Sequence, residues 1–272
     1  MGMTGEWKGT ISVVGEKNYL TDSSRRPPLK VVNFSGEDGE SIVYLASSSP
    51  GLFNGDRQEI SCLLKEGAHL FLTDASATEI HPSLTKEECR QNQVFQLGKN
   101  SKFEYIPEPM IPFKGSNYDG KMSIYMTEGA QAIIGEIITA GRVGRNEIFE
   151  YQCFQSSFEV YWDEQLQVWD SIRLIPESNL KENGILGDFT HISTLWILSD
   201  HIKIEHLQHI QNAILKDSEA FDGYGGASRL QNRGIVIRVL GHSTQTLQKV
   251  MKTCWDYFRL ELFHLHPFDV LK

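Results

Sequence analysis

The sequence predicts a mostly β protein, built as a stacked or elongated β-sheet scaffold of the solenoid or sandwich kind, with two α-helices near the C-terminus. Three observations carry this prediction. Apolar and polar residues alternate with period two through much of the first 200 residues. A turn followed by a strand recurs along this part, and helical periodicity is clear only beyond it. We expect one domain over residues 1–272, β-rich at 1–200 and helix-containing at 201–272.

The first strands are expected before residue 65. Trp7–Tyr19 alternates loosely and predicts a strand pair, whereas Asp22–Pro28 predicts a loop, because proline cannot donate to a β ladder. Ser47–Asp56, SSSPGLFNGD, carries two glycine turn signals and predicts a second loop. Apolar runs predict three more strands, at Leu29–Phe34, Ile42–Ala46 and Glu59–Leu64.

A turn and a strand then recur at a spacing of about thirty residues, which suggests β-layers stacked on one another. The three strands of this repeat are His69–Leu72, Phe103–Ile106 and Ala132–Ile134, and each follows a turn that contains glycine.

The central stretch Gly135–Tyr151, GEIITAGRVGRNEIFEY, holds the densest group of charge and glycine. We call residues 141–147, GRVGRNE, the charged knot. Gly141 and Gly144 predict a sharp bend between two strands, the second at Ile148–Tyr151.

The charges of this stretch leave two interpretations open. Arg142 and Arg145 could pair with Glu136 and Glu147, or they could contact carboxylates of a partner protein.

Two helices are expected near the C-terminus. The first spans about Ile204–Asp217, and the second starts with Ser243 or Thr244 as N-cap and ends near Phe263. Further strands are expected at Phe158–Trp162, Leu166–Trp169, Ile172–Ile175, Phe189–Leu198 and Gly234–Leu240.

Composition excludes some functions. The net charge of −9 argues against nucleic-acid binding, which needs a basic face. No apolar run approaches the roughly 20 residues that cross a membrane. The N-terminus lacks the features of a secretion signal, so we expect a cytoplasmic protein that contacts neither nucleic acid nor membrane. Its four scattered cysteines are then expected to be reduced thiols.

Few residues suggest chemistry. Asp56 and Glu59, at a strand entrance, could hold a cation loosely or could belong to a solvated loop. Glu79 and His81 would share one face of a strand, but two ligands do not close a metal site. Two histidine pairs, 206/209 and 264/266, could bind a metal weakly or lie exposed. No nucleophile elbow, P-loop, dinucleotide fingerprint or HExxH occurs, so we do not expect an enzyme.

Four motifs resemble the urease accessory protein family called UreD, or UreH in some organisms. They occur in the family's order across the first half of the chain. The motifs are SPGLFNGD at 49–56 with Glu59 after it, TDASATEIH at 73–81, PEPMIPF at 107–113 and AGRVGRNE at 140–147.

The resemblance implies a non-catalytic β-rich scaffold that binds UreF directly and the GTPase UreG through UreF. That assembly docks on apo-urease and helps to deliver nickel to its metal centre. The family is expected to pass nickel through an internal water-filled tunnel, with no cofactor tightly bound. Acidic residues along that path would match Asp56 and Glu59 here, and further Glu136 and Glu147.

Two alternatives remain open. A β-solenoid enzyme acting on carbohydrate could use Asp56 and Glu59 as acid and base. A bare structural adaptor would have the same partners and no path for an ion.

Overall fold

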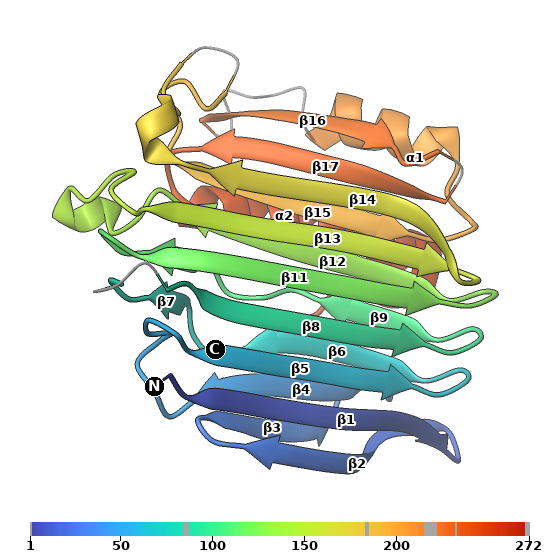
Figure 1. Cartoon of the computed structure of the whole chain (residues 1–272). Coiled ribbons are helices and arrows are strands. Elements are labelled where there is room, and N and C mark those ends of the chain that lie inside the picture. The colour runs from blue at the N-terminus through green and yellow to red at the C-terminus, as the bar shows by residue number, and fades with distance from the viewer. Residues whose placement is uncertain (1, 84–86, 183–184, 215–221, 232, 270–272) are drawn as a thin grey trace.

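The computed structural model describes residues 2–83, 87–182, 185–214, 222–231 and 233–269, and two β-sheets face each other in it (Figure 1). The seven-stranded sheet runs, in spatial order, β14 (Gln165–Leu174), β13 (Cys153–Trp162), β11 (Asn117–Met126), β8 (Cys89–Leu97), β5 (Arg57–Leu64), β1 (Thr4–Val14) and β2 (Lys17–Arg26). The ten-stranded sheet runs β16 (Gly223–Arg229), β17 (Gly234–Gly241), β15 (His191–Leu198), β12 (Gln131–Thr139), β9 (Lys102–Tyr105), β6 (His69–Asp74), β4 (Ser41–Ser47) and β3 (Leu29–Ser35), with the short β10 (Met110–Pro112) and β7 (Thr78–Ile80) beside β12.

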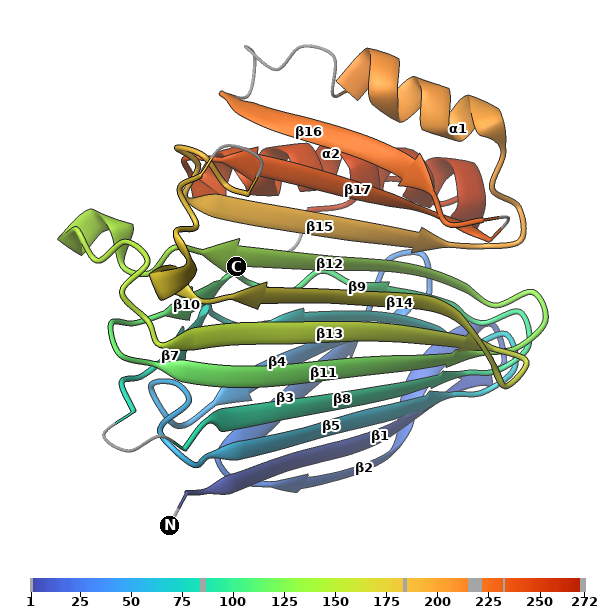
Figure 2. The same cartoon turned by 45° about the horizontal axis from the view of Figure 1, so that its top comes forward.

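The chain winds between the sheets in stacked, solenoid-like coils, which confirms the predicted fold class (Figure 2). Each coil places one strand in each sheet, as β5 then β6, β8 then β9, and β11 then β12. Neighbouring coils pair in parallel, and His69, Lys102 and Gln131 lie in register across β6, β9 and β12. The repeat of about thirty residues is therefore one turn of the coil.

Both predicted helices form. α2 (Thr244–Phe263) follows Ser243 as N-cap and buries its apolar side on the outer face of the ten-stranded sheet. The approach is close, because a Cβ on Gly135 of β12 would lie 2.8 Å from Sδ of Met251. α1 (Ile204–His209) continues as a π-helical turn over Ile210–Ile214, and the predicted end at 215–217 lies outside the described residues. Neither helix, over the part of the chain described, is long and apolar enough to cross a membrane.

Two expectations about local structure are wrong. The predicted loop at Asp22–Pro28 is a strand as far as Arg26, because β2 is an edge strand and only the two prolines lie outside the ladder. The predicted strand Ile148–Tyr151 is a turn, since Phe149 has a left-handed φ of 55° and its N–H donates back to the carbonyl of Ala140. The next strand begins at Cys153.

Candidate functional site

A polar band crosses the interior between the two sheets. The same pattern occurs in three strands, each with a polar residue between two apolar ones that point inward. Glu136 lies between Ile134 and Ile138 in β12, and Ser156 lies between Phe154 and Phe158 in β13. In β8, Gln91 and Gln93 separate Cys89 from Phe95. The band therefore divides one apolar cluster of the core from another, at right angles to the strands.

Side chains of the band bond to one another from coil to coil. Gln91 donates to Gln58 at 2.8 Å and accepts from the Tyr118 hydroxyl at 3.0 Å. Gln93 donates to the Tyr105 hydroxyl at 2.9 Å. Burial raises the pKa of Tyr105, and Asp74 raises it further. These polar groups are satisfied inside the core, at positions where apolar side chains would pack more simply.

Three cavities follow this band along the stack. The largest, of about 530 Å³, opens between β14 and the strands β15, β17 and β16. It shares Glu136, Ser156 and Trp196 with a cavity of about 40 Å³ between the sheets. That cavity shares Asp74 and Gln91 with a third, of about 60 Å³, beside the loop that follows β4.

Glu136 is the carboxylate at the junction of the first two cavities. The Ser156 hydroxyl donates to its Oε1 at 2.7 Å. Burial raises the pKa of Glu136 to about 7; Asp170 adds to this rise, whereas the Ser156 hydrogen bond and Arg238 oppose it. This carboxyl group therefore exchanges its proton near neutral pH, which is unusual for a glutamate.

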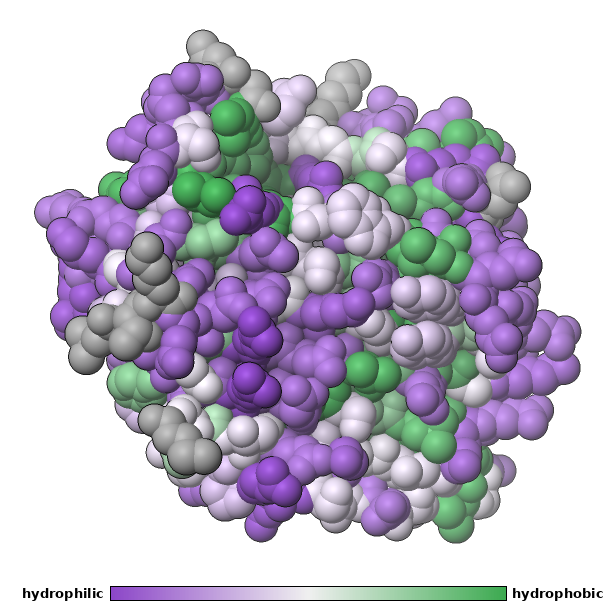
Figure 3. Space-filling view, in the orientation of Figure 1, coloured by the Kyte–Doolittle hydropathy of each residue, from purple (hydrophilic) through white to green (hydrophobic). Residues whose placement is uncertain are grey.

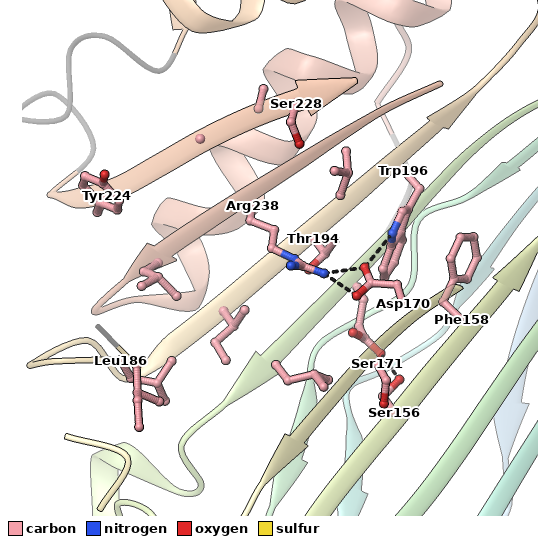
Figure 4. A pocket seen from close by; sticks show the side chains of 18 residues that line it. Ser156, Phe158, Asp170, Ser171, Leu186, Thr194, Trp196, Tyr224, Ser228 and Arg238 are labelled. Carbon is pink, nitrogen blue, oxygen red and sulfur yellow. Dashed lines mark hydrogen bonds and ion pairs between the residues drawn. The ribbon is translucent and has the colours of Figure 1, made fainter. Parts of the chain in front are cut away.

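Asp170 and Arg238 form an ion pair within the largest cavity. Figure 4 shows the Arg238 side chain reaching from β17 toward Asp170 of β14, where both carboxylate oxygens accept from the guanidinium. The indole N–H of Trp196 donates to the same carboxylate at 3.0 Å. The pair thus links β14, the edge strand of the seven-stranded sheet, to β17 of the ten-stranded sheet.

The sequence-predicted carboxylates do not meet in one place. Asp56 is buried, and its two oxygens accept from the backbone N–H groups of Met3 (2.7 Å) and Phe53 (2.9 Å). Glu59 lies exposed on the outer face of β5 and accepts from Asn92 at 2.9 Å. Of the predicted metal contacts, only Glu136 is among the residues that line the three cavities. The place of Asp56 and Glu59 on a nickel path stays a prediction.

The charged knot is a closed turn built on an ion pair. Arg142 Nε donates to Glu147 Oε2 at 2.8 Å, and this hydrogen bond lowers the pKa of Glu147. Gly141 has a φ of 126°, and a Cβ there would lie 2.6 Å from the Glu147 carbonyl oxygen, so glycine is required. Arg145 lies exposed, whereas a Cβ at Gly144 would meet nothing within 4 Å.

A column of four side chains, three of them rings and one the Arg142 guanidinium, connects the charged knot to other loops. The Arg142 guanidinium lies 4.1 Å from the ring centre of Phe113. The His81 ring is 5.0 Å from Phe113 and stacks on Phe53 at 4.2 Å. Glu79 lies 3.9 Å from the same imidazole. The four motifs singled out in the sequence therefore each supply one residue to a single column at one end of the coils.

The first histidine pair packs against α2, whereas His264 and His266 lie exposed. The buried His206 lies edge-on to Phe258, whereas His209 stacks on Tyr257 at 4.2 Å. The His266 carbonyl accepts from Arg259, and His264 is the left-handed residue that ends α2. In the described ranges, no three His, Cys, Asp or Glu side chains come close enough to hold a metal ion.

Sequence reasoning missed most of the polar band. The sequence of β5 and β8 did indicate it. In these strands apolar residues occupy every second position, and the alternation is interrupted by glutamine at Gln58, Gln91 and Gln93. The same signal was present at Asp170, between Val168 and Ile172 in phase, and at Arg238, between Val236 and Leu240.

Comparison with known proteins finds one family throughout. The profile of the UreD urease accessory protein family matches residues 4–269. The Urease accessory protein UreD of Lysinibacillus sphaericus is 34% identical over 85% of this chain and 87% of its own length. The proteins of the same name from Sporosarcina pasteurii and Staphylococcus aureus are 29% and 22% identical, over 90% and 96% of this chain and 96% and 94% of theirs.

Proposed function

Because the chain belongs to the UreD family of urease accessory proteins, we propose that it is a non-catalytic scaffold for nickel delivery to apo-urease. In this proposal it binds UreF directly and the GTPase UreG through UreF, in the cytoplasm. Nickel is cargo in transit, and no cofactor is held.

The polar band, with Glu136 at its centre, is the observation that supports an ion path. Each cavity along the band shares lining residues with the next one. The series begins at the cavity lined by Gln58 and Asp74 and reaches the two cavities lined by Glu136. A folded core gains little from buried carboxyl and amide groups, and their alignment suits a cation that sheds part of its water. Oxygen donors also bind nickel more weakly than thiolate or imidazole cages, so the ion can leave again.

Glu136 has the properties of a transfer point. Its proton is held only up to about neutral pH, so an arriving cation can displace it. The Ser156 hydroxyl donates to one oxygen, and the other accepts no hydrogen bond within the described part of the chain. Proton competition keeps the affinity low, which a delivery route requires.

The carbohydrate-enzyme alternative finds less support. Glycosidases place two carboxylates across one cleft. Here both oxygens of Asp56 are occupied by backbone N–H groups inside a loop, while Glu59 faces outward from β5.

The substitution Glu136→Gln tests the path. Glutamine keeps the size and can still accept from Ser156, but it removes the ionisable oxygen. With the full chain, UreF, UreG and apo-urease assembled at limiting nickel, we expect nickel content and urease activity to fall by roughly tenfold, as when a metal site loses a supporting group. Glu159→Gln, on the outer face of β13 where Glu159 pairs with Lys121, is the matched control. Normal nickel content with Glu136→Gln would show that the path avoids this residue.

A further inference from the structure

The two sheets end differently at the two ends of the stack. At one end, β2 and β3 follow each other directly, through the turn at Pro27 and Pro28, and β2 carries mostly polar and charged side chains. At the other end the ten-stranded sheet continues through β15, β17 and β16, whereas the seven-stranded sheet stops at β14 (Figure 2). Among the described strands β14 pairs only with β13, so its other edge is open.

The inner face of β17 and β16 therefore has no strand opposite it among the described residues, and Leu186 of the loop after β14 lies at the Leu240 end of this face. α2 covers the opposite face of β15 and β17. The uncovered face lines the cavity of about 530 Å³ with Val236 and Leu240, and Tyr224 is 68% exposed at its margin. Figure 3 shows this side hollowed near its top, with hydrophobic side chains along the hollow. We call this hollow the β14–β16 groove.

Charge in the groove selects the kind of occupant. Arg238 is half-exposed, and only one of its terminal nitrogens is used, on Asp170. Its other N–H groups have no partner among the described residues. In a chain of net charge −9, the remaining N–H groups of Arg238 favour an acidic side chain on the occupant of this cavity.

We infer that the β14–β16 groove receives an extended segment of a protein partner, which pairs with the open edge of β14 and continues the seven-stranded sheet over β17 and β16. Strand addition satisfies the free backbone groups of an edge and places alternate side chains on one face. Apolar side chains of the segment would fill the groove over Val236 and Leu240. An acidic side chain would pair with Arg238.

The inference rests on the proposed function in one respect, since the probes for this groove are UreF and apo-urease.

Gly226 allows a clean test, because it lines the groove, a Cβ there meets nothing within 4 Å, and its φ is not in the left-handed region. The Cβ of a larger residue therefore starts in open space, and we expect a large side chain at this position to occupy the groove.

Binding of the full chain to UreF and to apo-urease is measured for wild type, Gly226→Trp and Gly226→Ala. We expect Gly226→Trp to weaken one of the two interactions by at least about tenfold, and Gly226→Ala to leave it nearly unchanged. Equal melting temperatures of the free variants establish that the fold is kept. Hydrogen exchange of the wild-type complex should show slower exchange of the β14 amides.

Each other outcome has a distinct meaning. If wild type binds its partners, Gly226→Trp binds equally well and β14 amides are not protected, the groove inference is overturned and the proposed function stands. If wild type binds neither UreF nor apo-urease, both are overturned. If β14 becomes protected only in a concentration-dependent dimer of the chain alone, the occupant is a second copy, which also overturns the inference.

Discussion

Replacing Arg259 should destabilise the protein strongly, because α2 is held to the sheets by a buried charge cluster. The Arg259 side chain has no exposed surface and contacts the carboxylates of Glu104, Glu40 and Asp38. Its Nε also donates to the carbonyl of His266 at 2.8 Å. His69 adds a contact to Glu104 at 2.7 Å. Although burial opposes it, His69 and Arg259 hold the pKa of Glu104 below its usual range.

The expected loss of folding stability follows from the buried carboxylates that Arg259→Met leaves without their cationic partner. Glu104 is 0% exposed and Glu40 is 2% exposed, so neither carboxylate can turn to water. One oxygen of Glu40 already has no hydrogen-bond partner among the described residues. Removing one member of a buried ion pair costs about 3–5 kcal/mol, and we expect a loss in that range.

Urea denaturation followed by tryptophan fluorescence measures this loss. Lys252→Met on the same helix is the matched control, because the Lys252–Asp256 pair is partly solvated and should contribute less than about 1 kcal/mol. Adding Glu104→Gln to Arg259→Met should recover part of the stability, since it removes a stranded charge. A loss below about 1 kcal/mol for Arg259→Met, or no recovery in the double variant, would refute the reasoning.

Two further predictions concern the charged knot and Glu136. Arg142→Ala removes the ion pair with Glu147 and the contact with Phe113, so amides of residues 141–150 should exchange several-fold faster. Arg145→Ala, which removes an exposed side chain, should leave that exchange unchanged, and equal effects of the two variants would contradict the assignment. The folded-state pKa of Glu136, about 7, lies above its ordinary 4.5, so its contribution to stability is full below 4.5 and is lost as pH rises through 7. Glu136→Gln cannot ionise, and its melting temperature relative to wild type should therefore be higher at about pH 8 than at about pH 5; the opposite trend would reject the raised pKa.

Local pattern was enough to predict much of the fold. The turn and strand that recur near residues 69, 103 and 132 predicted the stacked coils, because a repeat must place the same face of each strand toward the same layer. The apolar spacing after Ser243 predicted α2, with its start to within one residue and its end near Phe263. Where the prediction failed, at Ile148–Tyr151, a single left-handed residue interrupts an alternation that otherwise reads as a strand.

The candidate site was only partly predictable. Glu136 stands out in the sequence as one charge within an apolar run, and the structure places it between the sheets. Asp56 and Glu59 are close in the chain, yet one is buried by backbone contacts and the other faces outward. Alternation tells which residues share a face of a strand, but it does not tell whether that face is turned to the core or to solvent.

The sequence by itself determined the strand periodicity, the length of each coil, the two C-terminal helices and the family. Only the tertiary structure decided which polar side chains meet. Asp170 and Arg238 are 68 residues apart and Glu104 and Arg259 are 155 apart, and each pair joins different layers of the molecule. Local propensity acts over a few residues, whereas these contacts depend on how many strands each sheet has and where each sheet ends. The open β14 edge is a consequence of that count.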